Sequence, residues 1–589
     1  MAWGKRRPTA VTGLAVLGIG IGTTVGCGAS GAAGEATLKI VGSADVDHLD
    51  TASGYATVGG VLTRQFSRTL FNVKAGATFE EAIKIRPDVA VEVPTTRNGG
   101  LSADHRTYTI RLRGGVLWNT PVPREVVAGD FVRGIKRLCN PASPSGAVAY
   151  YTSTIEGLET FCQGFTKVGA GDAAAMAAYQ NGHQVSGLRV KDDKTLVIGL
   201  MRPANDFLNI LALPFAAAAP QEYDSRIPDS PAFRRHTISD GPYQITSYLP
   251  NKEYVLERNR RWRQDSDPLR AQNVDRIRIT LGQDSPESVQ QQIERGTADL
   301  SWDQPVPRSR ISSLRSNPHF RIMGGSTNTP YLVFNVLSPN NDRALADREV
   351  RRAILYAIDK AALVRLYGGP QVAEMLHQVI PPGSIGHRPY DPYPTPGGAG
   401  DAAACRRRLA AAGHPTGLLL NFPYRINSHQ PQVAQLIQAN LKACGITTRL
   451  LPDTTGNLYG KTLVTPEEAR SGTWDIATPG WVPDWYGNNG RATLVPLFDG
   501  RHYGPNSANY GGYNNDRVNA LIDRALKATS TAEAAGLWAR ADRLIMEDAA
   551  IVPLINKRHP LLHSARVRNA LYLPTSQSYD FSQVKLSSS

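Results

Sequence analysis

The stretch YLVFNVLSPNNDRALADREVRRAILYAIDK, residues 331–360, decides the fold class. Its first six residues, YLVFNV, read as a continuous apolar strand, which suits a sheet that is buried on both faces. From residue 348 onward apolar residues recur at helical spacing, and we expect one helix that Gly368 ends. The members of this apolar stripe are Val350, Ile354, Ala357, Ile358 and Ala361. A strand followed by a helix indicates an α/β fold.

The same order recurs in residues 418–446, where LLLNFPY predicts a strand and VAQLIQANLKACGI predicts a helix. Residues 186–200 and 243–259 read as hairpins, and RTYTIRLR at 106–113 alternates as a half-buried strand does. We therefore expect mixed sheets with helices packed on them. The chain has 589 residues, and single cores stop growing at roughly 250–300 residues. Two or three domains are expected.

The first 26 residues predict a signal peptide, because the basic residues KRR at 5–7 precede the apolar run at 11–26. That run is short for a membrane span, which needs about 20 apolar residues. Small residues precede Cys27, and this pattern resembles a bacterial lipoprotein signal in which the cysteine is lipidated. Thr24 departs from the usual leucine, so ordinary secretion with cleavage elsewhere is the alternative. Residues 27–36 would form a flexible, lipid-anchored tether.

The five cysteines fit an exported protein. With Cys27 assigned to the lipid, Cys139, Cys162, Cys405 and Cys444 remain, and four cysteines allow three pairings. We favour the two local ones, Cys139–Cys162 and Cys405–Cys444, each of which closes a modest loop. Free buried thiols are the alternative.

The formal net charge is +14 at pH 7. The basic residues of the protein are dispersed along the chain, and no nucleic-acid motif accompanies them. A solvated surface that faces an anionic envelope explains this charge better than a nucleic-acid partner does.

No catalytic signature is visible in the sequence. There is no G-x-S-x-G, no H-E-x-x-H and no G-x-G-x-x-G after a strand. The twelve histidines are scattered, without the paired spacing of a zinc site. We therefore expect no enzymatic activity, no metal and no cofactor.

The segment GTWDIATPGWVPDWYGNNG, residues 472–490, concentrates aromatic residues in a predicted loop. It holds three of the eight tryptophans, Trp474, Trp481 and Trp485, with Asp484 between the last two. Clustered tryptophan is often core, and an aspartate in a turn often caps the local backbone. The other reading is a binding surface, because a carboxylate between indole rings attracts a cation.

Several stretches, in order, resemble the peptide-binding family of ABC-importer solute receptors, solute-binding protein family 5. Beside residues 331–360 they include short stretches at 293–299 and 381–383. The longer ones are YTIRLRGGVLWNTPVPREVVAGDFVRGIKR at 108–137, SDGPYQITSYLPNKEYVLERNRRWR at 239–263, GWVPDWYGNNG at 480–490, GGYNNDRVNALIDRAL at 511–526 and IMEDAAIVPLINKR at 545–558. Together they cover most of the mature chain.

The resemblance implies a two-lobed periplasmic-binding-protein-like α/β fold, class II and of the large peptide-binding type. An extra domain would sit on lobe I, and a hinge of two crossing strands would join the lobes. The implied segments are 37–72, 205–312 and 549–589 for lobe I, 73–204 for the extra domain and 313–548 for lobe II.

The same resemblance implies a ligand site. The W-x-x-D segment would line the cleft, and Asp484 would take the α-amino group of a ligand between Trp481 and Trp485. The remaining candidates are Tyr486 beside them, Asn335 at a strand end, Trp302 on the lobe I side and Tyr55 in the Gly-rich TASGYATVGG at 51–60. A purely structural role is the alternative for each.

One departure from the family concerns the other end of the ligand. In peptide-binding relatives a basic residue can lie six positions before the acid and help to bind the peptide's C-terminus. Here that position is Thr478. Arg491 or another residue would have to substitute, so a non-peptide solute such as a metal chelate, an oligosaccharide or a secreted metabolite is an open alternative.

The implied function is to bind a ligand without catalysing a reaction. A lipid-anchored, monomeric receptor on the extracytoplasmic face of a bacterial cell membrane would bind oligopeptides between its lobes and deliver them to the permease subunits of an ABC importer. Without the anchor it would be secreted or periplasmic. A signalling receptor without transport and an exported hydrolase are the competing interpretations.

Overall fold

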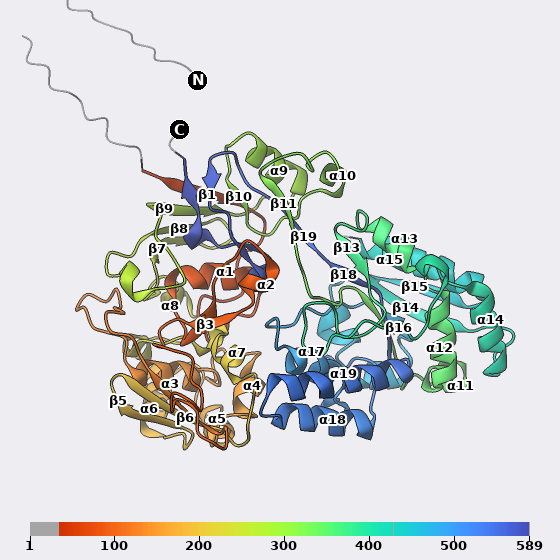
Figure 1. Ribbon diagram of the computed structural model, residues 1–589, viewed down its shortest axis with the longest axis horizontal. Helices are drawn as coiled ribbons and strands as arrows, with labels where there is room; N and C mark the ends of the chain where they lie inside the picture. The colour runs from red at the N-terminus through yellow and green to blue at the C-terminus, as the bar shows by residue number, and fades with distance from the viewer. Residues whose placement is uncertain (1–34, 428, 588–589) are drawn as a thin grey trace, which may run out of the picture. The chain divides into compact units, whose positions relative to one another are not determined.

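The computed structural model describes residues 35–427 and 429–587, and residues Ala36–Ser589 form one compact unit. Figure 1 shows the elements of this unit. The predicted signal peptide at 1–26, Cys27 and most of the tether at 27–36 lie outside the described residues. Among the described residues, no helix combines the length and the apolar character of a membrane span.

The predicted strand at 331–336 is observed as β12 (Tyr331–Phe334), whose four residues are all buried. It pairs antiparallel with β16 (Ile476–Ala477) and with β17 (Ile551–Pro553). The single helix expected after it is two helices, α12 (Arg348–Ala357) and α13 (Lys360–Leu366). The break falls here because the Asp359 side chain accepts from the Ala362 amide and so begins a second helix.

The strand and helix expected in residues 418–446 are confirmed. Strand β14 (Leu419–Arg425) leads through α15 (Gln430–Ala443) to β15 (Thr447–Asp453), and the two strands pair in parallel. A parallel pair needs such a helical crossover. These elements share one core with β12 and α12, and we call this part of the molecule lobe II.

A second core is built on a five-stranded sheet, and we call this part lobe I. Strand β1 (Thr37–Val41) is parallel to β9 (Arg276–Thr280) and β10 (Leu300–Ser301). Strands β7 (Tyr243–Leu249) and β8 (Glu253–Arg258) extend the sheet as an antiparallel hairpin. The sheet is therefore mixed, as the sequence predicts.

A third core surrounds a three-stranded antiparallel sheet. It consists of β4 (Thr107–Arg111), β6 (Thr195–Gly199) and β5 (Leu188–Asp192), with α3 (Ala128–Arg137) packed on it. This sheet lies inside the segment 73–204 that was expected to form the extra domain, and we keep that name for it.

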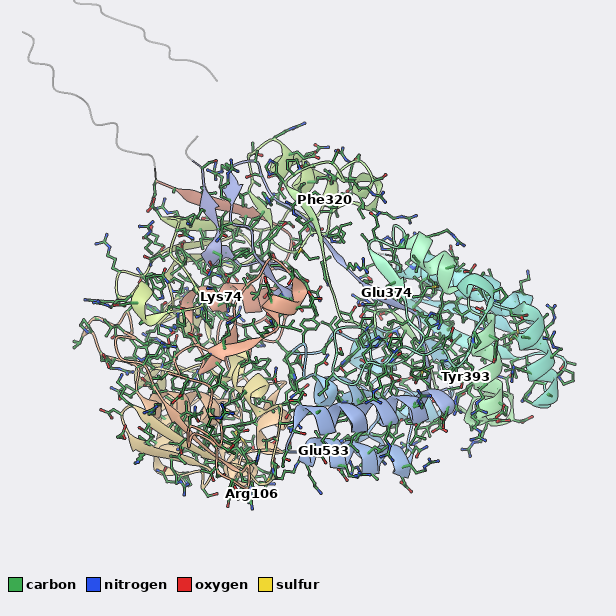
Figure 2. The ribbon with its side chains drawn as sticks, in the orientation of Figure 1. Lys74, Arg106, Phe320, Glu374, Tyr393 and Glu533 are labelled. Carbon is green, nitrogen blue, oxygen red and sulfur yellow. A yellow bond between two sulfur atoms is a disulfide. The ribbon has the colours of Figure 1, made fainter. Side chains whose placement is uncertain are left out.

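Two short strands connect the lobes. Strands β11 (Phe320–Met323) and β19 (His559–Leu562) pair antiparallel, and Figure 1 shows them between the two lobes. Figure 2 labels Phe320 on β11 and Glu374 on β13 (Ala373–Met375), which belongs to lobe II. Because β18 (Ile555–Lys557) still pairs with β13, the chain returns to lobe I only after residue 557, later than the expected boundary at 549.

Both predicted disulfides are present. Cys139 pairs with Cys162 across 5.3 Å between Cα atoms, and Cys405 pairs with Cys444 across 5.7 Å. Both distances lie within the usual range of about 4.4–6.8 Å. The first disulfide lies in the extra domain and the second in lobe II, so each fastens helices within one core and leaves the hinge free.

Candidate functional site

The aromatic loop of residues 481–486 begins in lobe II. The Trp481 amide donates to the Asn328 carbonyl at 2.9 Å, and the Asn328 amide donates back to the Trp481 carbonyl at 3.1 Å. The Trp481 indole donates to the carbonyl of Ala492 at 2.8 Å. These bonds fix the start of the loop, and helix α17 (Gly490–Phe498) follows it.

Asp484 is held from the opposite side of the molecule. The Tyr55 hydroxyl donates to Oδ1 at 2.9 Å, and the Tyr150 hydroxyl donates to Oδ2 at 2.6 Å. Burial raises the pKa of the Asp484 carboxyl, and the two tyrosine hydrogen bonds oppose this rise. Tyr150 lies on α4 (Val148–Thr152) of the extra domain, whereas Tyr55 precedes α1 (Thr57–Phe66) of lobe I.

Aromatic rings surround this carboxylate. Tyr55 stacks on Phe215 with ring centroids 5.5 Å apart, and Tyr150 meets Trp485 edge-on at 5.1 Å. Trp485 is 3% exposed, and it packs with the core of the extra domain although it belongs to the loop of lobe II. The loop therefore bridges the two sides by apolar contact as well as by hydrogen bonds.

A cavity of about 320 Å³ opens beside Asp484, near the lower end of the roughly 300–1,000 Å³ typical of small-molecule sites. Its lining comes from α1, from strand β2 (Phe71–Val73), from the 212–217 segment, from the aromatic loop and from residues near the C-terminus. The lining includes Tyr55, Arg64, Asn72, Val482, Asp484, Trp485, Tyr486, Leu573, Thr575 and Ser576.

The structure brings four of the seven predicted site residues to this cavity, namely Tyr55, Asp484, Trp485 and Tyr486. Tyr486 also meets Phe79 edge-on at 5.3 Å. Their role in binding stays a prediction.

The other three candidates do not line the cavity. Trp481 packs against the lobe II core. Asn335 is fully buried, and its amide donates to the carbonyls of Ala469 and Trp474 at 2.8 Å each. Trp302 is 3% exposed, and its indole donates to the Ala44 carbonyl at 2.9 Å. Because their polar atoms are already bonded, Asn335 and Trp302 serve the packing of their own lobes here.

Sequence reasoning missed Tyr150 and Arg64. Tyr150 stands in the short helix VAYYT with no motif around it, so nothing local distinguishes it from its buried neighbour Tyr151. Arg64 lies on an apolar helix and lines the cavity. Only the fold brings Tyr150 to Asp484 and Arg64 to the cavity.

Further contacts join the two sides outside the cavity. The Arg491 guanidinium pairs with Asp206 at 2.8 Å and donates to the Thr154 hydroxyl at 2.8 Å. The Asn488 amide donates to the backbone carbonyl of Asn205 at 3.0 Å. Arg491 and Asp206 are 4% and 5% exposed, so this ion pair is removed from water.

The site can hold a cation. It offers a half-buried carboxylate, two tyrosine hydroxyls and flat aromatic surface, and such groups form charge-assisted hydrogen bonds with an ammonium. Among the described residues, the lining includes no histidine, cysteine or lysine. No group of three or more metal-binding side chains occurs in the described part of the chain.

Comparisons with known proteins identify the family of this chain. Residues 84–501 match the model of the "Bacterial extracellular solute-binding proteins, family 5 Middle". The glutathione-binding protein GsiB of Salmonella choleraesuis is 24% identical over an alignment of 539 positions that covers 88% of this chain and 91% of that protein. GsiB of Escherichia coli O1:K1 is 23% identical and spans 96% of each chain.

Solved structures show the same fold. The clavulanic acid biosynthesis oligopeptide binding protein 2 superposes with a TM-score of 0.82 at 26% identity, covering 94% of this chain and 95% of that one. The periplasmic binding protein DppA from Helicobacter pylori, in complex with the peptide STSA, gives a TM-score of 0.68 at 19% identity over 93% and 98%.

The expected two-lobed fold is thereby confirmed. The family consists of binding proteins that work with ABC permeases outside the cytoplasm rather than of enzymes. The chain belongs to family 5 of the bacterial extracellular solute-binding proteins.

Proposed function

We propose that this protein captures amine-bearing solutes, oligopeptides first among them, in the cavity beside Asp484 and delivers them to a membrane permease. The observation that carries the proposal is the position of Asp484. It is a carboxylate of lobe II that lines the cavity and is reached by hydroxyls of lobe I and of the extra domain.

A ligand ammonium at Asp484 would contact both sides of the molecule. It would join the carboxylate of the loop and lie against Tyr55, Tyr150 and Trp485. A ligand shifts a conformational equilibrium only by its differential affinity for the two states. Because this ligand would bridge the lobes, it would favour the closed arrangement, which is the form presented to the permease.

The relatives support the ligand class in part. GsiB is a glutathione-binding protein, and the DppA structure holds a tetrapeptide. We extend the proposal to the cell surface, with Cys27 as the lipid anchor and the chain acting as a monomer. A non-peptide amine stays the second candidate, because Thr478 is buried and its hydroxyl donates to the Gln430 side chain at 3.1 Å.

Blocking the amine tests the proposal. Native mass spectrometry and calorimetry would compare a tripeptide pool with free N-termini and the same pool after N-acetylation. We expect acetylation to weaken binding by at least about ten-fold, or 1.4 kcal/mol. The variant Asp484→Asn should lose most of that preference, whereas Asp516→Asn, which removes an exposed carboxylate on α18 (Asp516–Lys527), should keep it.

Equal binding of the two pools by the unaltered protein would overturn the role of Asp484. Binding of neither pool would overturn the assignment to peptides.

A further inference from the structure

The charges that line the cavity are few. Among the described residues, its lining has only two charged side chains, Arg64 and Asp484. The charge that a ligand can bring into the cavity therefore depends on how each of these two is already balanced.

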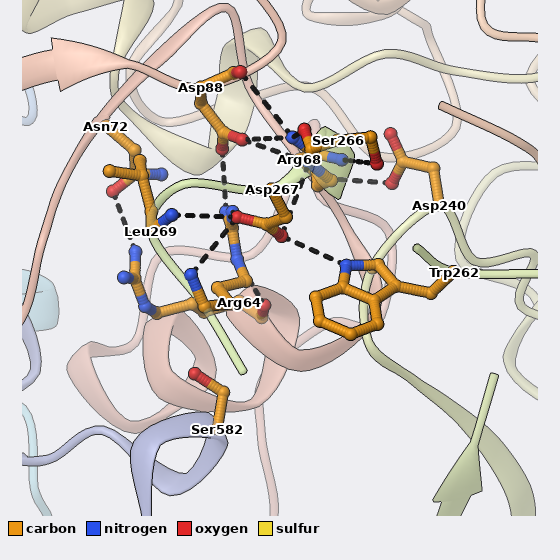
Figure 3. A network of polar contacts seen from close by, with 12 residues as sticks. Arg64, Arg68, Asn72, Asp88, Asp240, Trp262, Ser266, Asp267, Leu269 and Ser582 are labelled. Carbon is orange, nitrogen blue, oxygen red and sulfur yellow. Dashed lines mark hydrogen bonds and ion pairs between the residues drawn. The ribbon is translucent and has the colours of Figure 1, made fainter. Parts of the chain in front are cut away.

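Arg64 is balanced by its own partner. Its Nε donates to Asp580 Oδ2 at 2.8 Å, and its Nη1 donates to the Asn72 side chain at 3.0 Å, a contact that Figure 3 shows. Arg64 is 5% exposed and Asp580 is fully buried. The pair is thus a closed ion pair with no net charge.

One nitrogen of the Arg64 guanidinium has no hydrogen-bond partner among the described residues. This nitrogen, Nη2, is buried. A buried donor of this kind gains most from an acceptor oxygen. Since Asp580 already cancels the positive charge of Arg64, this side chain offers no unbalanced positive charge to a ligand carboxylate.

No positively charged side chain pairs with Asp484 among the described residues. Its two described partners, Tyr55 and Tyr150, are neutral hydroxyls that bring hydrogen bonds but no positive charge. Burial raises the pKa of Tyr55 and Tyr150, as does the neighbouring Asp484, so both hydroxyls keep their protons at neutral pH. The cavity therefore carries one net negative charge when Asp484 is ionised.

The positions that could supply another cation are occupied. Thr478 stands where relatives can carry a basic residue, and it does not line the cavity. Arg491, the substitute considered from the sequence, is engaged by Asp206 and Thr154 and does not line the cavity either. A ligand carboxylate inside the cavity would have no cation of its own.

We propose that this cavity selects solutes with one positive charge and no carboxylate inside it. The suitable class is amines whose other end is an amide, an ester or a hydroxyl, and peptides long enough for their carboxylate to reach water. The inference rests on the proposed function for the ammonium contact. It adds that a short zwitterion would bury an unpaired charge, which costs free energy.

Blocking the other end of the ligand tests this inference. Calorimetry at pH 7 would compare the dipeptide Ala-Phe with its C-terminal amide. We expect the amide to bind at least about ten-fold more tightly. Equal binding, or tighter binding of the free acid, would overturn the inference.

A gain-of-charge variant gives a second readout. Val482 lines the cavity and is 39% exposed, so a longer side chain fits there without disturbing the core. In Val482→Lys the added ammonium should reduce the amide preference by about ten-fold or reverse it. Val482→Leu, the matched neutral variant, should keep the original preference. An unchanged ratio in Val482→Lys would count against the inference.

The two tests fail separately. If acetylation abolishes binding while amidation has no effect, the amine site is supported and the selection against carboxylates is wrong. If neither dipeptide binds and acetylation of the tripeptides has no effect, both the proposed function and this inference are wrong.

Discussion

Two aspartates beside tryptophans in the same segment have opposite environments. Asp475 follows Trp474 in lobe II and is 1% exposed. Its carboxylate accepts from the Ser338 hydroxyl at 2.5 Å, the Asn340 amide at 3.1 Å and the Asn421 backbone at 2.7 Å. Asp484 precedes Trp485, is half-buried, and accepts only from hydroxyls outside lobe II among the described residues.

The difference shows that residue type and aromatic neighbours do not identify a binding carboxylate. The distinguishing property is whether donors of its own core already saturate it. Asp475 has a complete set from lobe II, and it holds strand ends together. Among the described residues, Asp484 has no donor from lobe II, so its carboxylate oxygens can accept hydrogen bonds from groups across the cleft.

The largest effect is expected at Asp475. Asp475→Ala removes an acceptor from three donors, of which the Ser338 hydroxyl belongs to a buried residue, and should reduce the free energy of unfolding by about 3 kcal/mol. Urea denaturation measures the loss. Asp475→Asn, which keeps one oxygen, should lose less. A loss below about 1 kcal/mol for Asp475→Ala would erase the contrast with Asp484.

Asp484→Ala should act on binding instead. We expect the affinity for an amine-bearing peptide to fall by at least about ten-fold, while the free energy of unfolding changes by less than about 1 kcal/mol. Calorimetry and urea denaturation on the same preparation separate the two quantities. A variant that lost stability but not affinity would place Asp484 in the same class as Asp475.

The pH dependence of binding sharpens the comparison. Burial raises the pKa of Asp484, and only the ionised form pairs with an ammonium. Affinity should therefore fall on acidification, and the fall should begin above the ordinary aspartate pKa of about 3.9. Calorimetry between pH 3 and pH 8 would locate the midpoint of this fall. A midpoint at or below the ordinary value would contradict the buried position of Asp484.

The smallest effect is expected from the tyrosines. Tyr150→Phe removes a hydrogen bond that opposes the rise in the Asp484 pKa, so the acid limb of binding should move to higher pH. At neutral pH the affinity should change by less than about ten-fold, in line with one hydrogen bond. Tyr55→Phe should act in the same direction. A shift to lower pH in either variant would show that the hydroxyls do not stabilise the ionised acid.

Much of the fold could be predicted from the sequence, because periodicity reports burial directly. The strand at 331, the strand–helix unit at 418–446 and both disulfides were expected and are observed. The split between α12 and α13 was missed, because the apolar spacing continues through the Asp359 cap.

The site was only partly predictable. Asp484 and its neighbours stood out by composition and by resemblance. Tyr150 and Arg64 did not, since the packing of the extra domain brings Tyr150 to Asp484 and α1 brings Arg64 to the cavity. Asn335 and Trp302 were expected at the site and are not there. Their side-chain donors are bonded to backbone carbonyls of their own lobes, and such bonds cannot be recognised in the sequence.

The path of the chain through β11 and β19 has a consequence for the order of folding. Lobe II lies between these two strands as one continuous segment, so its core can form without the C-terminal end of the chain. Lobe I needs both ends of the chain, since Phe581 and Val584 complete its core. Leu573, Thr575 and Ser576 also complete the wall of the cavity. A molecule truncated before β19 would therefore keep the lobe II core but would lack both a complete lobe I core and a complete cavity wall.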